Sequence, residues 1–340
     1  MPILMRRASF LIILFTSSVF AQIDDDIADI EDIANDLVFL SAQYVDPAAE
    51  AAVYQSSGGW FTSAKKKGLW ALEVSIQGNI LFIPNKNKDF LINENQLQNI
   101  EIQGQESIAL SPTALGGDDT VVLEGHIGED FFEFDSPEGL NESYVKHAQL
   151  QAGLGLWFGT TFIVRYSPKI KFDKTYYQIL GVGLQHNLSQ WMPFLKDSNF
   201  DVAGLITYSN YTVSDNFSDI NLPLGTVLNS VIVDGESFMF NVIASKQVNK
   251  FNFSTALGVT TTNFEYTIGG DEGALPVLSI LNRELNAADN NLSNFKIDLG
   301  VDYKIHDFSL NSMVTFGKYT NLIFGINYNF NNNKKSELSN

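Results

Sequence analysis

The chain has 340 residues, 45% of them hydrophobic and 12% aromatic, and its formal net charge at pH 7 is −18. It contains no cysteine, which excludes disulfides, iron–sulfur clusters and thiolate zinc sites. The negative charge argues against a nucleic-acid partner, because phosphates attract basic surfaces. We also predict no cofactor and no metal site. The acidic run after residue 23 lacks the glycine and the spaced ligands of a calcium loop.

Residues 1–21 have the pattern of a signal peptide. Arg6 and Arg7 precede a short apolar run, and Val19 and Ala21 occupy the positions where cleavage requires small residues. A membrane anchor is the alternative, but a spanning helix needs about 20 apolar residues. We therefore expect an exported protein whose mature chain begins at Gln22.

Residues 22–60 are predicted to form an acidic amphipathic helix and a loop. Isoleucine and leucine recur there at helical spacing, with aspartates between them. We expect the helix to end before Pro47, because proline interrupts helical hydrogen bonding. The helix is either docked on the surface of the domain or acts as a plug or periplasmic lid. No other helix of comparable quality is expected.

From Gly68 onward the chain alternates between apolar and polar residues, as strands with two different faces do. In the segment 294–305 the apolar set is Phe295, Ile297, Leu299, Val301, Tyr303 and Ile305. Ten such segments are evident, each about as long as the nine to eleven residues of a membrane-spanning strand. We predict an all-β fold, an antiparallel up-and-down transmembrane β-barrel of about 10–14 strands over residues 61–330, followed by a polar tail at 331–340.

The connections between these segments alternate in length, which is the plan of an outer-membrane barrel. Long connections are expected at about 84–143, 213–235 and 267–292. Two to four further strands could lie within residues 97–134, where β-like segments recur.

The alternation alone also fits a water-soluble barrel or sandwich, so the choice of the lipid-facing side needs further features. The polar set is rich in Gly, Ser, Asn, Gln and Thr, whereas a wetted sheet usually carries more Lys and Glu. Aromatic residues near strand ends are expected to form interfacial girdles: Trp70, Trp157, Tyr166, Tyr303, Tyr328 and Phe330. We therefore expect the apolar set to face lipid.

The segment 150–195 resembles an uncharacterised family of Gram-negative outer-membrane barrels, a domain of unknown function. The features that carry the resemblance are an "RY-x-P" strand end at Arg165, then "G-x-G-x-x-H" from Gly181 to His186, and a turn that holds Trp191 and Pro193. More distantly, the chain is similar to outer-membrane transporters for long-chain fatty acids. That resemblance implies an N-terminal helical hatch and a fourteen-strand barrel. The polar tail departs from the aromatic ending usual in such barrels.

Charged residues of the polar set are predicted to face the barrel lumen, because Lys or Arg at the bilayer midplane costs about 2–4 kcal/mol. The candidates are Glu73, Arg165, Lys296, Asp298, Asp302 and Lys304. They form either a ladder of salt bridges that braces the interior or a lining that contacts a solute or gates the pore.

No catalytic constellation is evident, and we predict that the chain is not an enzyme. The histidines are His126, His147, His186 and His306, and none is near a G-x-S-x-G motif. A hydrolase would need a serine, a histidine and an orienting group at one strand level. His186 is expected to cap a turn or to lie at the membrane interface.

The expected function is passage or binding of a small solute, which could be hydrophobic, with the N-terminal helix as plug. The alternative is a non-transporting structural or surface-interaction barrel that works through its long loops. The expected location is the outer membrane. Its lipids, the barrel assembly machinery and the solute are the expected partners.

Overall fold

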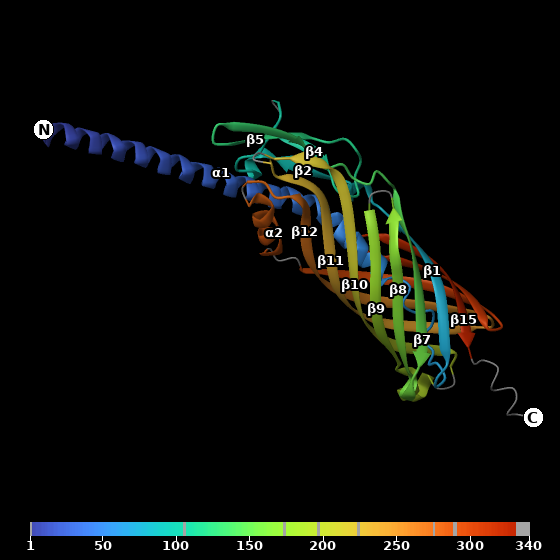
Figure 1. Ribbon diagram of the computed structural model, residues 1–340. Coiled ribbons are helices and arrows are strands. Elements are labelled where there is room, and N and C mark those ends of the chain that lie inside the picture. The colour runs from blue at the N-terminus through green and yellow to red at the C-terminus, as the bar shows by residue number, and fades with distance from the viewer. Residues whose placement is uncertain are drawn as a thin grey trace, which may run out of the picture.

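The computed structural model describes residues 2–104, 107–172, 175–195, 198–222, 225–274, 276–287 and 291–330. Ten antiparallel strands close into a barrel (Figure 1), because β1 pairs with β7 on one side and with β15 on the other. The barrel strands are β1 (Leu72–Phe82), β7 (Tyr144–Gly155), β8 (Thr160–Phe172), β9 (Thr175–Asn187), β10 (Phe200–Asn221), β11 (Val227–Val248), β12 (Phe251–Asp271), β13 (Asn291–Ile305), β14 (Phe308–Phe316) and β15 (Thr320–Phe330). The predicted fold class is confirmed.

The apolar set of each strand points outward, as predicted. In β12 exposed and buried residues alternate over most of the strand, and in β15 Asn321, Ile323 and Asn327 are buried while Phe324 and Ile326 are exposed. Closure pairs the edges of the sheet, which a backbone in hydrocarbon requires. The outer surface is therefore an apolar belt, and the polar set lines the lumen.

The further strands within the first long connection lie outside the barrel. They form a two-stranded sheet of β2 (Asp89–Asn93) and β4 (Ile108–Pro112), and a three-stranded sheet of β3 (Glu101–Ile102), β5 (Val122–Ile127) and β6 (Asp130–Asp135). The prediction that this region could add strands to the wall was wrong. Its strands have two to six residues, too few to span a bilayer. We call residues 84–143 the cap.

Strands β10, β11 and β12 have 22, 22 and 21 residues and extend past their neighbours at the end of the barrel that carries the cap. The predicted loop at 213–235 is therefore wrong in most of its length, because β10 and β11 continue through it. Bulges between Asn216 and Ile220 and between Leu228 and Ser230 disturb the alternation there. This disturbance explains why the pattern was not recognised as strand.

Helix α1 (Pro2–Ser57) runs from the cap end into the interior of the barrel (Figure 1). The prediction that it ends before Pro47 was wrong. Alanines at positions 48, 49, 51 and 52 favour the helix, and burial against the barrel wall stabilises it. Packing therefore outweighs the cost of a proline within a helix.

A second helix, α2 (Val277–Ala287), follows β12 and packs against α1 and β12. It was not predicted, although Val277, Leu281 and Leu285 recur every four residues and are buried. Within the described part of the chain, neither helix combines the length and apolar character needed to cross a bilayer. The polar tail at 331–340 lies outside the described residues, and the signal peptide at 1–21 stays a prediction.

The lipid-facing belt generates a test. We expect Leu257→Arg, in the middle of β12 and 55% exposed, to lower the free energy of unfolding in lipid vesicles by about 2–4 kcal/mol, because an arginine would face the bilayer midplane. Leu110→Arg is the matched control, since Leu110 is 65% exposed but lies on β4, outside the barrel. Equal stability of the two variants in urea titrations would contradict the proposed belt.

Candidate functional site

The lumen is occupied by the chain's own N-terminal segment. From Tyr44 onward the buried face of α1 lies inside the part of the barrel nearest the cap. After Ser57 the chain turns at Gly58 and Gly59 and continues through the lumen, away from the cap, to Lys67. We call residues 44–67 the plug. Gly59 has a φ of +74°, the left-handed conformation that commonly ends a helix and that glycine adopts without strain.

Arg165 of β8 holds the plug at the end of α1. Its Nη1 donates to the carbonyl oxygens of Ser56 and Gly58, at 2.9 and 2.8 Å, and its guanidinium lies 4.0 Å from the ring centre of Trp60. Its Nε and Nη2 donate to Oε1 of Gln151, and Arg165 is only 1% exposed. A buried guanidinium is thus matched to the negative end of a helix.

Lys296 of β13 provides a second contact of this kind. Its Nζ donates to the Ser57 carbonyl oxygen at 2.7 Å and to Oδ2 of Asp298 at 2.8 Å. Thr315 donates to the other carboxylate oxygen at 2.6 Å. Lys296 and Asp298 are 2% and 0% exposed, so this ion pair is within the packed lumen.

Amide side chains of the wall complete the ring around the end of the helix. Gln77 donates to the Gly59 carbonyl at 3.0 Å, and Gln151 donates to that of Trp60 at 3.3 Å. Gln149 donates to Gln77 at 2.6 Å and fixes its orientation. The carbonyls just after the end of the helix therefore also find donors on the wall.

The lower part of the plug is held in the same way. Its carbonyl oxygens at Thr62, Ser63 and Ala64 accept hydrogen bonds from Asn252, Gln185 and Asn187, respectively. Because these contacts are polar, water could replace them if the plug left.

The upper part of α1 is fixed to the cap. The Asp36 carboxylate is 2% exposed and accepts hydrogen bonds from the backbone N–H groups of Gln98, Asn99 and Ile100 at 2.8 to 3.0 Å. Such a concave arrangement of backbone N–H groups binds an anion well. Asp29 accepts a single bond from the Gly128 N–H at 2.9 Å.

Tyrosines join the middle of α1 to the barrel and the cap. Tyr44 donates to Asp215 at 3.2 Å, and burial, assisted by that carboxylate, raises the pKa of Tyr44, so the hydroxyl remains a donor. Tyr266 donates to Asp46 at 2.9 Å, and burial raises the pKa of Asp46. Lys318 forms an ion pair with Glu50.

The predicted lumen-facing residues fall into two groups. Arg165, Lys296 and Asp298 surround the end of α1, whereas Glu73, Asp302 and Lys304 lie farther from the cap. Asp302 is buried, and Lys304, at the end of β13, is exposed. Glu73 pairs with Lys67 at 2.8 Å. A continuous ladder of salt bridges is not seen among the described residues, since the cations mainly bind carbonyls.

Five of the six predicted interfacial aromatics lie toward the end of the barrel opposite the cap. Trp70 and Trp157 are 50% and 56% exposed, with ring centres 4.9 Å apart. Tyr303 contacts Phe251, and Tyr328 contacts Phe330. Tyr166 is instead in the middle of β8, paired with Leu150 and Leu180.

The histidines do not assemble a hydrolase triad in the described part of the chain. Nε2 of His147 lies 2.5 Å from the Ser167 hydroxyl, but its Nδ1 has no hydrogen-bond partner, so no third group orients the ring. Nδ1 of His186 lies 2.9 Å from the Thr160 hydroxyl, and its Nε2 accepts from Trp191 at 3.3 Å. His186 thus links two neighbouring turns.

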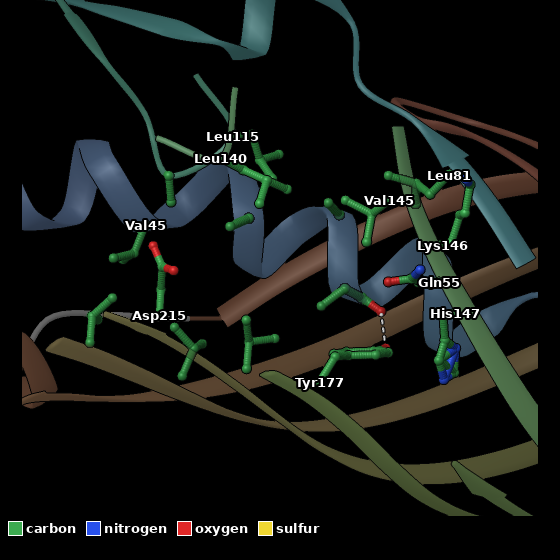
Figure 2. A pocket seen from close by; sticks show the side chains of 17 residues that line it. Val45, Gln55, Leu81, Leu115, Leu140, Val145, Lys146, His147, Tyr177 and Asp215 are labelled. Carbon is green, nitrogen blue, oxygen red and sulfur yellow. Dashed lines mark hydrogen bonds between the residues drawn. The ribbon is translucent and has the colours of Figure 1, made fainter. Parts of the chain in front are cut away.

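Beside α1, near the cap, a largely apolar cavity of about 70 Å³ remains (Figure 2). Its walls include Ala48, Ala52, Val145 and Val233, and Tyr177 donates to the Ala52 carbonyl at 3.1 Å. This space admits a few water-sized molecules. A larger solute would need the plug to move.

We call the wall side chains that donate to the plug around the end of α1 the polar ring. Sequence reasoning missed these hydrogen bonds because their acceptors are backbone atoms. The segment 56–61 was interpreted as a loop, and the glutamines Gln77 and Gln151 were not singled out. The two adjacent glycines before a tryptophan were the available signal, since they indicate a chain reversal at a crowded position.

We expect Asp36→Ala to loosen the cap, because three backbone N–H groups would lose their shared acceptor. The free energy of cap opening should fall by about 2–4 kcal/mol, as buried bonds to charged groups are worth roughly 1.5–3 kcal/mol. Limited proteolysis within residues 84–143 measures it. Asp29→Ala, on the same helix, removes one bond and should have little effect. Equal cleavage rates in the two variants would refute this role.

Gly59→Ala should weaken seating of the plug. A Cβ there would lie 2.5 Å from Oε1 of Gln77, in addition to the backbone cost of about 1–2 kcal/mol at positive φ. Gly225→Ala is the control, since its φ is +84° but nothing lies within 4 Å of the added Cβ. Thermal unfolding should show the larger loss at position 59. A loss no greater than at 225 would show that position 59 is not crowded.

The comparisons with known structures show low similarity over most of the chain. They include Ail, the attachment invasion locus protein of Yersinia pestis, at 7% identity and TM-score 0.27, covering 77% of this chain and 100% of that one. A FadL homologue from Pseudomonas aeruginosa has 13% identity and TM-score 0.30, covering 73% and 60%, respectively. The translocator domain of autotransporter NalP from Neisseria meningitidis has 11% identity and TM-score 0.34, covering 85% and 100%.

None of the curated proteins matches the sequence. A family model, described as a family of unknown function (DUF6588), matches residues 3–330, which include the plug, the cap and the whole barrel. The chain belongs to this family of unknown function.

Proposed function

We propose that this protein is an outer-membrane barrel that passes or binds a small solute, and that the plug closes its lumen. The observation that carries the proposal is the polar ring around the end of α1. There the wall offers Arg165, Lys296 and glutamines to backbone carbonyls. Hydrogen bonds of this kind can be exchanged for bonds to water or to a solute.

The remainder of the lumen supports passage. Outside the plug, small polar residues dominate the inward face of β1, β14 and β15, as in Ser75, Asn79, Asn311 and Asn327. A polar interior of this kind is typical of barrels with a watery channel. With the plug in place, two cavities beside it measure about 70 and 40 Å³, so we infer a closed state.

By the usual plan of such barrels, the short turns face the periplasm and the cap faces outward. The plug then enters the lumen from the outer side, and the cap covers this entrance. A solute arriving from outside would meet the cap before the plug.

A surface-interaction role is the second candidate. The sheet of β2 and β4 exposes Leu91, Ile108 and Leu110, which are 54%, 51% and 65% exposed. An apolar face on the cap would suit a binding partner. In that case the plug would be a permanent part of the core.

A reversible disulfide between the plug and the barrel wall distinguishes the two roles. The Oγ atoms of Ser63, in the plug, and Ser245, in β11, are 3.3 Å apart, and the chain has no cysteine of its own. We expect the double variant Ser63→Cys/Ser245→Cys to form a disulfide on oxidation. In planar bilayers the reduced protein should show discrete openings, and oxidation should abolish them.

The single variant Ser63→Cys is the control, and its openings should not respond to oxidation. If neither variant opens in the reduced state, the plug is permanent and the surface-interaction role is favoured. If oxidation leaves the openings of the double variant unchanged, the current does not depend on the plug.

A further inference from the structure

We propose that the wall groups which bind the plug around the end of α1 are a binding site for an aromatic carboxylate. In this inference the plug occupies the site in the closed state, and the solute takes its place when the plug withdraws. The inference rests on the proposed function and specifies the chemical class of the solute.

The site consists of donors that converge from four strands. Arg165, Lys296, Gln77 and Gln151 belong to β8, β13, β1 and β7, and they donate to five consecutive carbonyl oxygens of the plug, from residue 56 to residue 60. All of these contacts have the donor on the wall and the oxygen on the plug. The wall is thus complementary to oxygen atoms that carry negative charge.

The charge of the site indicates a monoanion. Lys296 is neutralised by Asp298, at 2.8 Å. Arg165 forms no ion pair within the described part of the chain, and its partner is the helix end, which carries about half a unit of negative charge. A carboxylate would supply a full unit of charge and could accept the two hydrogen bonds that Nη1 of Arg165 donates to the plug.

The space beside Arg165 indicates a flat, apolar body. The Trp60 indole lies 4.0 Å from the guanidinium and against Gly181 and Gly183 of β9. A Cβ on these glycines would lie 2.8 and 3.3 Å from the indole, so larger residues would crowd the ring. When the plug withdraws, the indole leaves a slot of aromatic shape next to an unpaired cation. Trp60 and the adjacent carbonyls therefore resemble an aromatic carboxylate in both shape and charge.

The test uses Ser57→Cys as a reporter of plug release, with benzoate as the probe. Ser57 is 4% exposed, its hydroxyl donates only to the Tyr54 carbonyl in its own helix, and the chain has no other thiol. We expect benzoate to accelerate labelling by a thiol reagent by about tenfold, the effect of one charge-assisted hydrogen bond changing partner. Benzylamine lacks the carboxylate and acetate lacks the aromatic ring, so each should have little effect on the labelling rate.

Adding Arg165→Gln to the Ser57→Cys reporter should remove the response of the labelling rate to benzoate. Arg283→Gln is the matched control, because Arg283 is exposed on α2, and it should keep the full response. Arg165→Lys retains the charge and should respond more weakly, which provides a second variant if the glutamine variant fails to fold.

The outcomes separate this inference from the proposed function. If benzoate leaves the labelling rate unchanged, or if Arg165→Gln responds as strongly as Arg283→Gln, the binding site is refuted. The openings of the reduced Ser63→Cys/Ser245→Cys variant would still support the proposed function. If benzoate accelerates labelling but the reduced barrel shows no openings, the site is supported and passage through the lumen is refuted.

Discussion

The structure depends on one constraint: a helix that ends inside a closed barrel leaves carbonyl oxygens without partners. Water is largely excluded there, so an unpaired carbonyl would be costly. Arg165 and Lys296 meet this requirement from the wall, and their own burial is offset by the same contacts. Burial of the two cations and burial of the helix end would each be unfavourable alone, because each supplies the hydrogen-bond partners of the other.

This mutual dependence gives the barrel an unusual interior. In a soluble domain the interior is mainly apolar and most charged groups remain outside. Here the outer surface of the barrel is apolar, and the interior combines buried polar residues of the wall with apolar clusters around α1 and Trp60. The space inside the barrel is therefore filled by the contacts that hold α1 in place.

Much of the barrel could be predicted from the sequence, because alternation reports directly on which face each residue occupies. The ten strands and the outward apolar set followed from it. Strands β10 and β11 were shortened because their bulges disturb the alternation, and the short strands of the cap resembled wall strands in composition. Pro47 gave a false helix end because tertiary packing outweighed a local rule.

The site was less accessible to sequence reasoning. The charged candidates were recognisable on the polar set of their strands, but their partners were not, since backbone carbonyls carry no signal of residue type. Gln77 and Gln151 look like any other polar residues of the wall. Only the pair Gly58 and Gly59 indicated that the chain turns in a crowded place.

The continuity of α1 has a mechanical consequence. From Asp36, which binds the cap, to Ser57 at the polar ring the helix is unbroken, a length of about 30 Å at 1.5 Å per residue. A rod of this kind transmits displacement along its axis with little loss. Movement of the cap and movement of the helix end are thereby coupled, and a displacement of the cap would be transmitted to the contacts of Arg165.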